Sequence, residues 1–407
     1  MIPVQEAKQR ILAAFHTLTP ELVPLGDALG RVLAEDVVAR VTQPPVAMSA
    51  MDGYAVRAAD VAKVPATLRQ IGAAPAGGAF EGAVGAGECV RIFTGGPMPR
   101  GTDAVVIQED TAAEGSTITV RESAAAGRYV RRAGLDFKAG DVGIAAGRVL
   151  NARDIGFAAA MNHPWLKVVR KPRVAIISTG DEVVLPGDPL GPNQIVSSNG
   201  PALAAFVTSA GGEPVSLGIA PDSAAALQKM VEGARGADLL VTTGGASVGD
   251  HDLVRSALGE RGLVLDFWQI AMRPGKPLIF GKIGDTPLLG LPGNPVSSLV
   301  CALVFLRPAL LRMLGLTEPA AGERPSARLG RNLEANDRRE DYLRAALATD
   351  PAGRLVATPF EKQDSSMLSL LAKADCLVVR PPHAPAAKAG EPVEIIPLDP
   401  RAGRRSA

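Results

Sequence analysis

Apolar positions recur at helical spacing in several stretches of the chain and form short continuous runs in others. Between residues 172 and 317 the two patterns alternate, which predicts a mostly parallel sheet with helices on both faces. The runs predict strands over 173–178, 213–220, 238–243, 265–271 and 277–283. The helical spacing predicts helices over 3–15, 25–37, 151–162, 200–211, 223–234 and 252–260, and a long helix over 296–314.

Two further regions have short β-prone runs of the kind found in small β domains. Residues 43–136 are rich in glycine and proline and hold short β-prone runs, which predict an inserted β-rich domain. After a linker at 317–327, four more short runs predict a C-terminal β-barrel. The expected fold class is multidomain α/β, with a mostly parallel α/β sandwich domain, the inserted domain, an elongated helical region and the barrel. The expected boundaries are 1–42 with 137–170 for the helical region, 43–136 for the inserted domain, 171–318 for the α/β domain, 319–400 for the barrel and 401–407 for a disordered tail.

Composition narrows the range of partners and compartments. Of 407 residues 47% are hydrophobic, and 43 basic against 42 acidic side chains leave a net charge of +1. A chain so nearly neutral is not expected to bind nucleic acid or an anionic membrane. The longest apolar run, 299–306, is too short to span a bilayer, and the start lacks a signal-peptide core, so we expect a cytoplasmic protein. The scattered cysteines and histidines show no disulfide framework or structural zinc site.

Glycine-rich and acidic residues follow the predicted strands of the α/β region. The segment TTGGASVGDHD, 242–252, comes directly after one of them. Ligands bind such sheets at the carboxyl ends of the strands, where glycines let backbone N–H groups approach an anion, expected here to be a phosphate. Asp250 and Asp252 repel a phosphate unless a cation lies between them, so we expect Mg²⁺. A plain turn with solvated acids is the alternative interpretation.

Other short motifs place charge at turns. LPGNPVSS, 291–298, joins a strand to the long helix, where free N–H groups suit either an anion or a structural cap. MRPGKP, 272–277, holds Arg273 and Lys276 in a proline-stiffened turn that suits an oxyanion. The sequence contains no P-loop, Rossmann glycine motif or nucleophile elbow. Many carboxylates, a few cations and no obvious nucleophile favour transfer of an anionic group by a metal and positioned charges.

Six motifs in order resemble one family. SAMDGYA, RIFTGGPMP, STGDE, TTGGASVGDHD, RPGKP and LPGNPVSS closely resemble those of molybdopterin molybdenumtransferases of the bacterial MoeA type, similar to the E domain of gephyrin and of plant Cnx1. The resemblance covers nearly the whole chain. It implies a transferase of molybdenum cofactor biosynthesis that inserts molybdenum from molybdate, its co-substrate, into adenylylated molybdopterin and releases AMP with the help of Mg²⁺. It also implies a homodimer, with the upstream adenylyltransferase and acceptor molybdoenzymes as partners.

Matched position by position, the resemblance assigns roles to individual residues. It implies that Glu182, Asp222 and Asp252 bind Mg²⁺ or orient a water, and that Asp52 and Asp136 are further catalytic residues. The residues implied to bind substrate are Thr94, Gly244, Gly245, Ser247, Asp250, Pro292, Asn294, Pro295 and Ser297. Those implied to bind molybdate are Arg273, Lys276, Arg339 and Ser365.

Departures from the family pattern leave some points open. GLDF at 134–137 stands where the family often has Gly-Glu-Asp, Arg338 precedes Arg339 where glycine is common, and position 273 is Arg where some members have Lys. Molybdate and tungstate are nearly isosteric dianions, so a basic pocket separates them poorly. The alternative functions are the related molybdopterin adenylyltransferase, which the inserted and barrel domains argue against, and a non-catalytic scaffold, which the clustered charges argue against.

Overall fold

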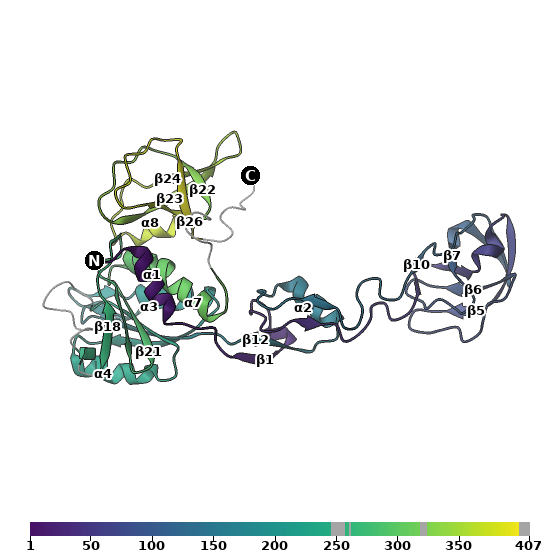
Figure 1. The fold of residues 1–407 in the computed structure, drawn as a ribbon, viewed down its shortest axis with the longest axis horizontal. Helices are drawn as coiled ribbons and strands as arrows, with labels where there is room; N and C mark the ends of the chain where they lie inside the picture. The colour runs from purple at the N-terminus through teal and green to yellow at the C-terminus, as the bar shows by residue number, and fades with distance from the viewer. Residues whose placement is uncertain (246–256, 260–261, 318–323, 399–407) are drawn as a thin grey trace. The chain divides into compact units, whose positions relative to one another are not determined.

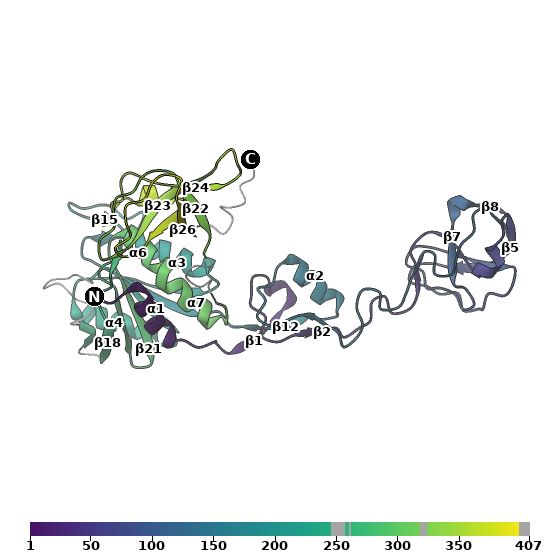
Figure 2. The ribbon, with the colours of Figure 1, turned by 45° about the horizontal axis from the view of Figure 1, so that its top comes forward.

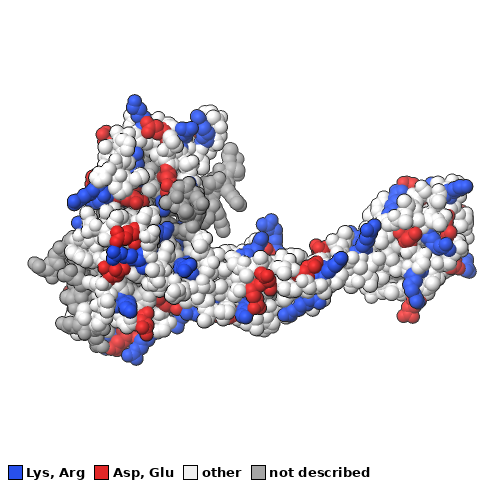
Figure 3. All heavy atoms as spheres, in the orientation of Figure 1, with Lys and Arg blue, Asp and Glu red and all other residues white. Residues whose placement is uncertain are grey.

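The structure, a computed structural model, describes residues 1–245, 257–259, 262–317 and 324–398. The chain divides into two compact units, one made of 1–20 and 169–407 and the other of 21–168 (Figure 1). Each apolar cluster found among the described residues lies wholly within one unit. On the visible face of each unit, basic and acidic side chains are interspersed, as the near balance of their numbers leads one to expect (Figure 3).

The first unit contains a six-stranded sheet in the order β16-β13-β17-β21-β20-β18. The four strands from β16 to β21 pair in parallel, and β20 and β18 are added antiparallel, which confirms the predicted mostly parallel sheet. The strands are β13 (Arg173–Thr179), β16 (Glu213–Ala220), β17 (Leu239–Thr243), β18 (Leu263–Phe267), β20 (Ile279–Ile283) and β21 (Thr286–Leu291).

Helices cover both faces of this sheet, because its strands are apolar on both sides. Along β13, Val174 and Ile176 point into one core, and Ala175 and Ile177 point into the other. The first core lies under α1 (Val4–Ala13), α3 (Asn199–Ser209) and the long helix Pro295–Met313, and the second under α4 (Ala224–Val231). Figure 1 shows α1, α3 and α7 on one side of the sheet and α4 on the other.

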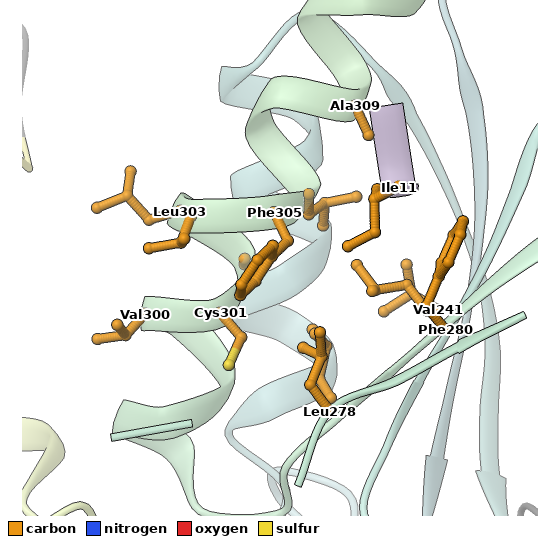
Figure 4. Close-up of a cluster of buried hydrophobic side chains, with 14 of the residues drawn as sticks. Ile11, Val241, Leu278, Phe280, Val300, Cys301, Leu303, Phe305 and Ala309 are labelled. Carbon is orange, nitrogen blue, oxygen red and sulfur yellow. The ribbon is translucent and has the colours of Figure 1, made fainter. Parts of the chain in front are cut away.

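The predicted long helix is present and runs from α6 (Pro295–Cys301) through a π turn (Ala302–Leu306) into α7 (Arg307–Met313). Pro308, which has no N–H to donate to the preceding turn, is the second residue of α7 and lies two positions after the π turn. The helix is long and apolar enough to cross a membrane, but 78% of its most apolar window is buried inside the protein. Figure 4 shows its side chains, among them Cys301 and Phe305, packed with Ile11, Val241 and Phe280, so it is the core helix of this unit.

The C-terminal part of the first unit is a barrel, as predicted, and it is closed by five strands where the sequence showed four. The pairing of β25 with β23 closes the ring β23-β24-β22-β26-β25, whose strands lie together in Figures 1 and 2. A short strand before the barrel, β19 (Met272–Arg273), pairs with β23 in parallel. The barrel strands are β22 (Ser326–Leu329), β23 (Glu340–Thr349), β24 (Leu355–Pro359), β25 (Cys376–Arg380) and β26 (Pro392–Pro397), and α8 (Leu368–Ala372) lies between β24 and β25 in the sequence.

The second unit contains a six-stranded sheet in the order β7-β4-β6-β5-β9-β8. These strands are β4 (Gly53–Val56), β5 (Ala66–Ala74), β6 (Glu88–Ile92), β7 (Ala104–Ile107), β8 (Thr111–Glu114) and β9 (Thr117–Val120). The rest of the unit holds the strand pairs β1–β12, β2–β11 and β3–β10 and the helix α2. Their bounds are β1 (Pro20–Pro24), β2 (Val37–Val38), β3 (Met48–Ser49), β10 (Val130–Arg131), β11 (Val142–Ile144), α2 (Ala152–Ala160) and β12 (Trp165–Val169).

Helix α2 forms where its sequence predicts it, but the helix predicted over 25–37 does not form. Asn151 caps α2 in a reciprocal box with Asp154, which satisfies free N–H groups of the first turn. In 25–37 the structure has a short 3₁₀ turn, Leu25–Asp27, a second turn in which Gly30 has a φ of 75°, isolated β-bridges at Val32 and Leu33, and the first residue of β2. A right-handed helix cannot pass through that conformation. The helically spaced Leu33 and Val37 are still buried, in a core of extended segments.

The N-terminal helix α1 belongs to the α/β core. Val4, Ala7 and Ile11 are buried against the sheet of the first unit, although the sequence suggested an elongated helical region for 1–42. The segments 21–42 and 137–168 form strand pairs around the single helix α2. The predicted disordered tail, 401–407, and most of the predicted helix 252–260 lie outside the described residues.

Candidate functional site

A cavity of about 760 Å³, here called the cleft, lies at the carboxyl ends of three parallel strands. Residues 178–180, 243–245 and 292–295 line it, at or directly after the ends of β13, β17 and β21. This is the edge of an open α/β sheet where ligands bind. The predicted site residues that line the cleft are Glu182, Asp222, Gly244, Gly245, Lys276, Pro292, Asn294 and Pro295.

Glycine is needed at the floor of the cleft because backbones approach closely there. Gly244 has a φ of 87°, and a Cβ atom on it would lie 2.6 Å from the carbonyl oxygen of Thr179. Its N–H donates to the carbonyl oxygen of Leu291 at 3.3 Å, which ties the ends of β17 and β21 together. On Gly293, a Cβ atom would lie 3.5 Å from the Cα of Gly244. A side chain is therefore excluded at Gly244, whereas one on Gly293 would make only an ordinary van der Waals contact with it.

We expect Gly244→Ala to lower turnover about tenfold or more while the protein stays folded, because the backbone must shift at the cleft floor. Steady-state rates and a thermal melt measure the two effects. Gly353→Ala is the matched control: Gly353 has a φ of 77°, but a Cβ atom there meets open space. If both variants keep full turnover, the cleft floor is not part of the site.

Two polar side chains of the cleft wall were missed from the sequence. Asn199, at the start of α3, donates from Nδ2 to Thr243 Oγ1 at 2.8 Å and to the Gly293 carbonyl at 2.7 Å. Its Oδ1 and the Oγ1 of buried Thr179 have no hydrogen-bond partner among the described residues. Such atoms are costly in a protein interior unless a ligand or water satisfies them. The available signal was weak, since Asn199 before a predicted helix resembles a cap, and Thr179 lies in the STGDE motif.

The acidic side of the cleft comes from the loops that follow β13 and β16. Asp181 Oδ1 accepts a hydrogen bond from the Asp222 N–H at 2.9 Å, which holds the two loops together. Glu182 and Asp222 line the cleft and are exposed. Within the described residues, no three acidic, histidine or cysteine side chains come together in a way that could hold a metal ion. The predicted residues Ser247, Asp250 and Asp252 lie outside the described residues.

Lys276 and Arg273 leave the same turn in different directions. Lys276 lines the cleft, whereas neither Arg273 nor Arg339 is among the described residues that line it. Arg273 donates to Asp341 and to Asn336, and Arg339 pairs with Asp337 at 2.7 Å.

The pKa of the Asp337 carboxyl lies far below its usual range. The largest cause is the hydrogen bond from the Arg339 guanidinium, and the second is the hydrogen bond from the Arg339 backbone N–H. Arg338 is exposed, while Arg339 is half-buried in this pair. The surroundings of the two arginines therefore differ, and neither is among the described residues that line the cleft.

The barrel contributes one loop to the cleft. Ser365 accepts a hydrogen bond from Asn294 Nδ2 at its Oγ, 3.0 Å away, and its carbonyl accepts from the Val296 N–H at 3.1 Å. Its neighbour Ser366 lines the cleft. Ser297 is buried in α6, only 4% exposed, and is not among the lining residues.

Arg344, another residue missed from the sequence, holds this barrel loop through hydrogen bonds to residues before and after the two serines. Its Nη1 donates to the Met367 carbonyl at 3.2 Å and its Nε to Gln363 Oε1 at 3.2 Å. The side chain is 1% exposed, and its Nη2 has no partner among the described residues. A buried cation inside a strand such as 342–349 leaves no signal in the hydrophobic pattern.

In the second unit, two of the predicted residues meet. Asp52 Oδ1 accepts from the Thr94 N–H at 2.7 Å and from Thr94 Oγ1 at 2.8 Å. These two hydrogen bonds, the backbone one first, lower the pKa of Asp52, so the carboxylate stays ionised to lower pH. Arg91 lies close to this pair and stacks on Phe93, 4.8 Å from the ring centroid. Asp136 is exposed in the same unit.

Comparison with known proteins covers almost the whole chain. Residues 2–162 match the MoeA N-terminal region (domain I and II), 175–312 match a probable molybdopterin binding domain, and 326–398 match the MoeA C-terminal region (domain IV). The molybdopterin molybdenumtransferase of Haemophilus influenzae is 34% identical over 403 residues, which are 98% of this chain and 99% of that protein. Molybdopterin molybdenumtransferase 2 of Mycobacterium tuberculosis is 36% identical over 405 residues, which are 97% of this chain and 99% of that protein.

A solved structure has the same fold. The crystal structure of the molybdopterin biosynthesis MoeA protein from Pyrococcus horikoshii superposes with a TM-score of 0.86 at 33% sequence identity. The match covers 98% of this chain and 99% of that chain. Identity at this level over full length, with all three regions matched in order, shows the family. The chain belongs to the MoeA family of molybdopterin molybdenumtransferases.

Proposed function

We propose that this enzyme transfers molybdenum from molybdate into adenylylated molybdopterin, cleaving the adenylate and releasing AMP with the help of Mg²⁺. One observation carries the proposal. The cleft combines a glycine floor, two carboxylates on one side and a lysine that reaches it from another segment. That combination suits a substrate with both a phosphate and an oxyanion, because opposite charges on different walls hold two groups at fixed positions.

The glycine floor is the proposed place of the substrate phosphates. Without side chains on Gly244, Gly245 and Gly293, a phosphate can lie close to the backbone. The unpaired Asn199 Oδ1 and Thr179 Oγ1 can accept hydrogen bonds from N–H groups of the pterin, which satisfies them when substrate is bound. Water is then excluded from this part of the cleft.

The carboxylates of the cleft fit a magnesium ion. Mg²⁺ prefers oxygen ligands and is bound in many sites by one or two carboxylates together with substrate phosphates. Glu182 and Asp222 are two such carboxylates on one cleft, so we propose that they hold the ion, with Asp252 as the third ligand that the resemblance implies. When bound, Mg²⁺ supplies positive charge to the phosphates as the adenylate is cleaved. Cleavage also needs a water that attacks the pyrophosphate bond of the adenylate, and the same carboxylates are the proposed groups that orient it.

Lys276 is the proposed ligand of molybdate, which is a substrate here. Its side chain is exposed at the cleft, and an ammonium binds a tetrahedral oxyanion as a point charge without fixing its rotation. Ser365, held by Asn294, is the proposed second contact from the barrel side. Tungstate has almost the same shape and charge and is expected to compete.

We also propose that the enzyme is a cytoplasmic homodimer, in which Asp52, Thr94 and Asp136 act as site residues. The Thr94 contacts that keep Asp52 ionised support a role in binding a cation or a polarised group. The upstream adenylyltransferase and the acceptor molybdoenzymes are its proposed partners. Light scattering of the purified protein gives the mass of the assembly, and a monomer at working concentrations contradicts the homodimer.

The proposed reaction is tested by giving the purified protein adenylylated molybdopterin, Mg²⁺ and molybdate. We expect AMP release together with a cofactor that activates an apo-molybdoenzyme, and loss of both when Mg²⁺ is chelated or molybdate is omitted. Consumption of ATP and free molybdopterin, with adenylate as the product, would replace this function by that of the adenylyltransferase. Absence of any turnover with all components present favours the scaffold.

A further inference from the structure

We propose that Arg91 is a positioning residue of the second unit, which holds Asp52 and Thr94 at a fixed spacing so that the Asp52 carboxylate presents one oxygen to its ligand. The inference rests on the proposed function of Asp52 as a site residue. It adds to that site a cation that acts through Asp52 and not on the substrate.

The two oxygens of the Asp52 carboxylate have different surroundings. Oδ1 accepts from the Thr94 N–H at 2.7 Å and from Thr94 Oγ1 at 2.8 Å. Among the described residues no donor contacts Oδ2, and Asp52 is exposed. The Thr94 contacts therefore orient the carboxylate and leave the lone pairs of Oδ2 for a ligand.

Both residues lie just beyond the paired strands that carry them. Strand β4 begins at Gly53, directly after Asp52, and β6 ends at Ile92, two positions before Thr94. The pairing of β4 with β6 therefore stops short of the two residues. Their spacing depends on the contacts that side chains make around this end of the strands.

The guanidinium of Arg91 supplies such contacts from β6. Its Nη1 donates to the Gly53 carbonyl at 2.8 Å, and its Nη2 donates to Gln108 Oε1 at 2.6 Å. The Gln108 N–H in turn donates to the Asp52 carbonyl at 3.1 Å. Two successive carbonyls, those of Asp52 and Gly53, are therefore held by the connected side chains of Arg91 and Gln108.

Two aromatic rings fix the guanidinium itself. Arg91 Cζ lies 4.8 Å from the ring centroid of Phe93, which precedes Thr94, and 5.3 Å from that of Tyr54. Tyr54 is buried and lies opposite Arg91 in the pairing of β4 with β6. A planar guanidinium stacks on such rings, so Arg91 contacts the chain next to Asp52 and the chain next to Thr94 at once.

Arg91 also places a positive charge beside the carboxylate. The Thr94 N–H lowers the pKa of Asp52 most, the Thr94 hydroxyl comes next, and the charge of Arg91 lowers it further, while desolvation opposes these effects. Thr94 and Gln108 are uncharged, so Arg91 is the charged group among the described residues that contributes to this shift. The carboxylate therefore stays ionised at lower pH, as binding of a cation or a polarised group requires.

Arg91→Met tests the inference, because it removes the guanidinium and keeps an unbranched side chain. We expect molybdate-dependent AMP release to fall about tenfold. The acid limb of its pH profile should move to higher pH, since the pKa of Asp52 rises when the charge is lost and the Thr94 contacts loosen. An NMR titration of the Asp52 carboxyl should show the same rise without any turnover.

A double variant separates positioning from direct contact with substrate. In an Asp52→Asn background, Arg91→Met is expected to cause no further loss of AMP release, because Arg91 acts through the carboxylate that is already gone. A further tenfold loss in that background would show that Arg91 contacts the substrate itself, and it overturns the inference.

Arg69→Met is the matched control. It removes the guanidinium of another pair on the same sheet, Arg69 with Glu88 at 2.6 Å, and is expected to leave AMP release and the pKa of Asp52 unchanged. A thermal melt shows that both methionine variants fold. An Asp52 titration in Arg91→Met identical to that of the wild type contradicts the inference. A wild-type protein without molybdate-dependent turnover instead contradicts the proposed function.

Discussion

Replacement of Asp222 by alanine is expected to reduce molybdate-dependent AMP release about a hundredfold to a thousandfold, the largest loss of activity that we expect from a single site. Asp222 and Glu182 are the proposed magnesium ligands on the cleft, so the variant leaves one of these two carboxylates. The fold should survive, because Asp222 is exposed and its backbone N–H, which donates to Asp181, is retained in the variant. Single-turnover measurements of AMP release with saturating Mg²⁺ give the loss in the chemical step.

Asp285→Ala is the matched control for this experiment. Asp285 is also an exposed carboxylate in a loop of the same sheet, but it lies between β20 and β21, at the opposite edge from the cleft. Its replacement is expected to leave AMP release unchanged. Equal rates in Asp222→Ala and the wild type would remove Asp222 from the mechanism. Equal losses in the two alanine variants would point to a general effect on the domain.

The largest expected loss of stability follows from Phe305→Ala, which should lower the free energy of unfolding by about 3–5 kcal/mol. Phe305 lies in the π turn of the core helix, is fully buried, and packs among residues of α1 and the sheet (Figure 4). Removing the ring leaves a cavity that a helix fixed on both sides cannot fill by moving. Urea unfolding followed by circular dichroism measures the change.

Leu190→Ala provides the comparison, since Leu190 is 59% exposed in the same unit. An exposed side chain loses little contact on truncation, so its effect should stay within about 0.5 kcal/mol. A loss as small for Phe305→Ala would mean that the π turn is not part of the core.

The α/β domain and the barrel could be predicted from the sequence because their patterns are long and repeated. Strands apolar on both faces alternate with helices between 172 and 317, and few topologies satisfy that order. The helix predicted over 25–37 does not form, and the cause is local. Buried Leu33 and Val37 are spaced as in a helix, but Gly30 adopts a positive φ, so the same apolar residues are buried by extended segments instead.

Part of the candidate site could be predicted for the same reason. Glycines and acids that follow parallel strands must meet at one edge of the sheet, and Glu182, Asp222 and Gly244 do so. The hydrogen bond from Arg273 to Asp341 could not be predicted, since Asp341 lies 68 residues further along the chain. Asn199 was missed because a single polar residue before a helix has a sufficient structural explanation as a cap.

The most direct test of the account is a crystal structure of the enzyme with AMP and Mg²⁺ bound. We predict the phosphate above the glycine floor of the cleft, at Gly244 and Gly293, with the ion between it and the carboxylates of Glu182 and Asp222. A phosphate bound elsewhere in the protein, with the cleft empty, would contradict the central claim that the reaction takes place at the carboxyl ends of β13, β17 and β21.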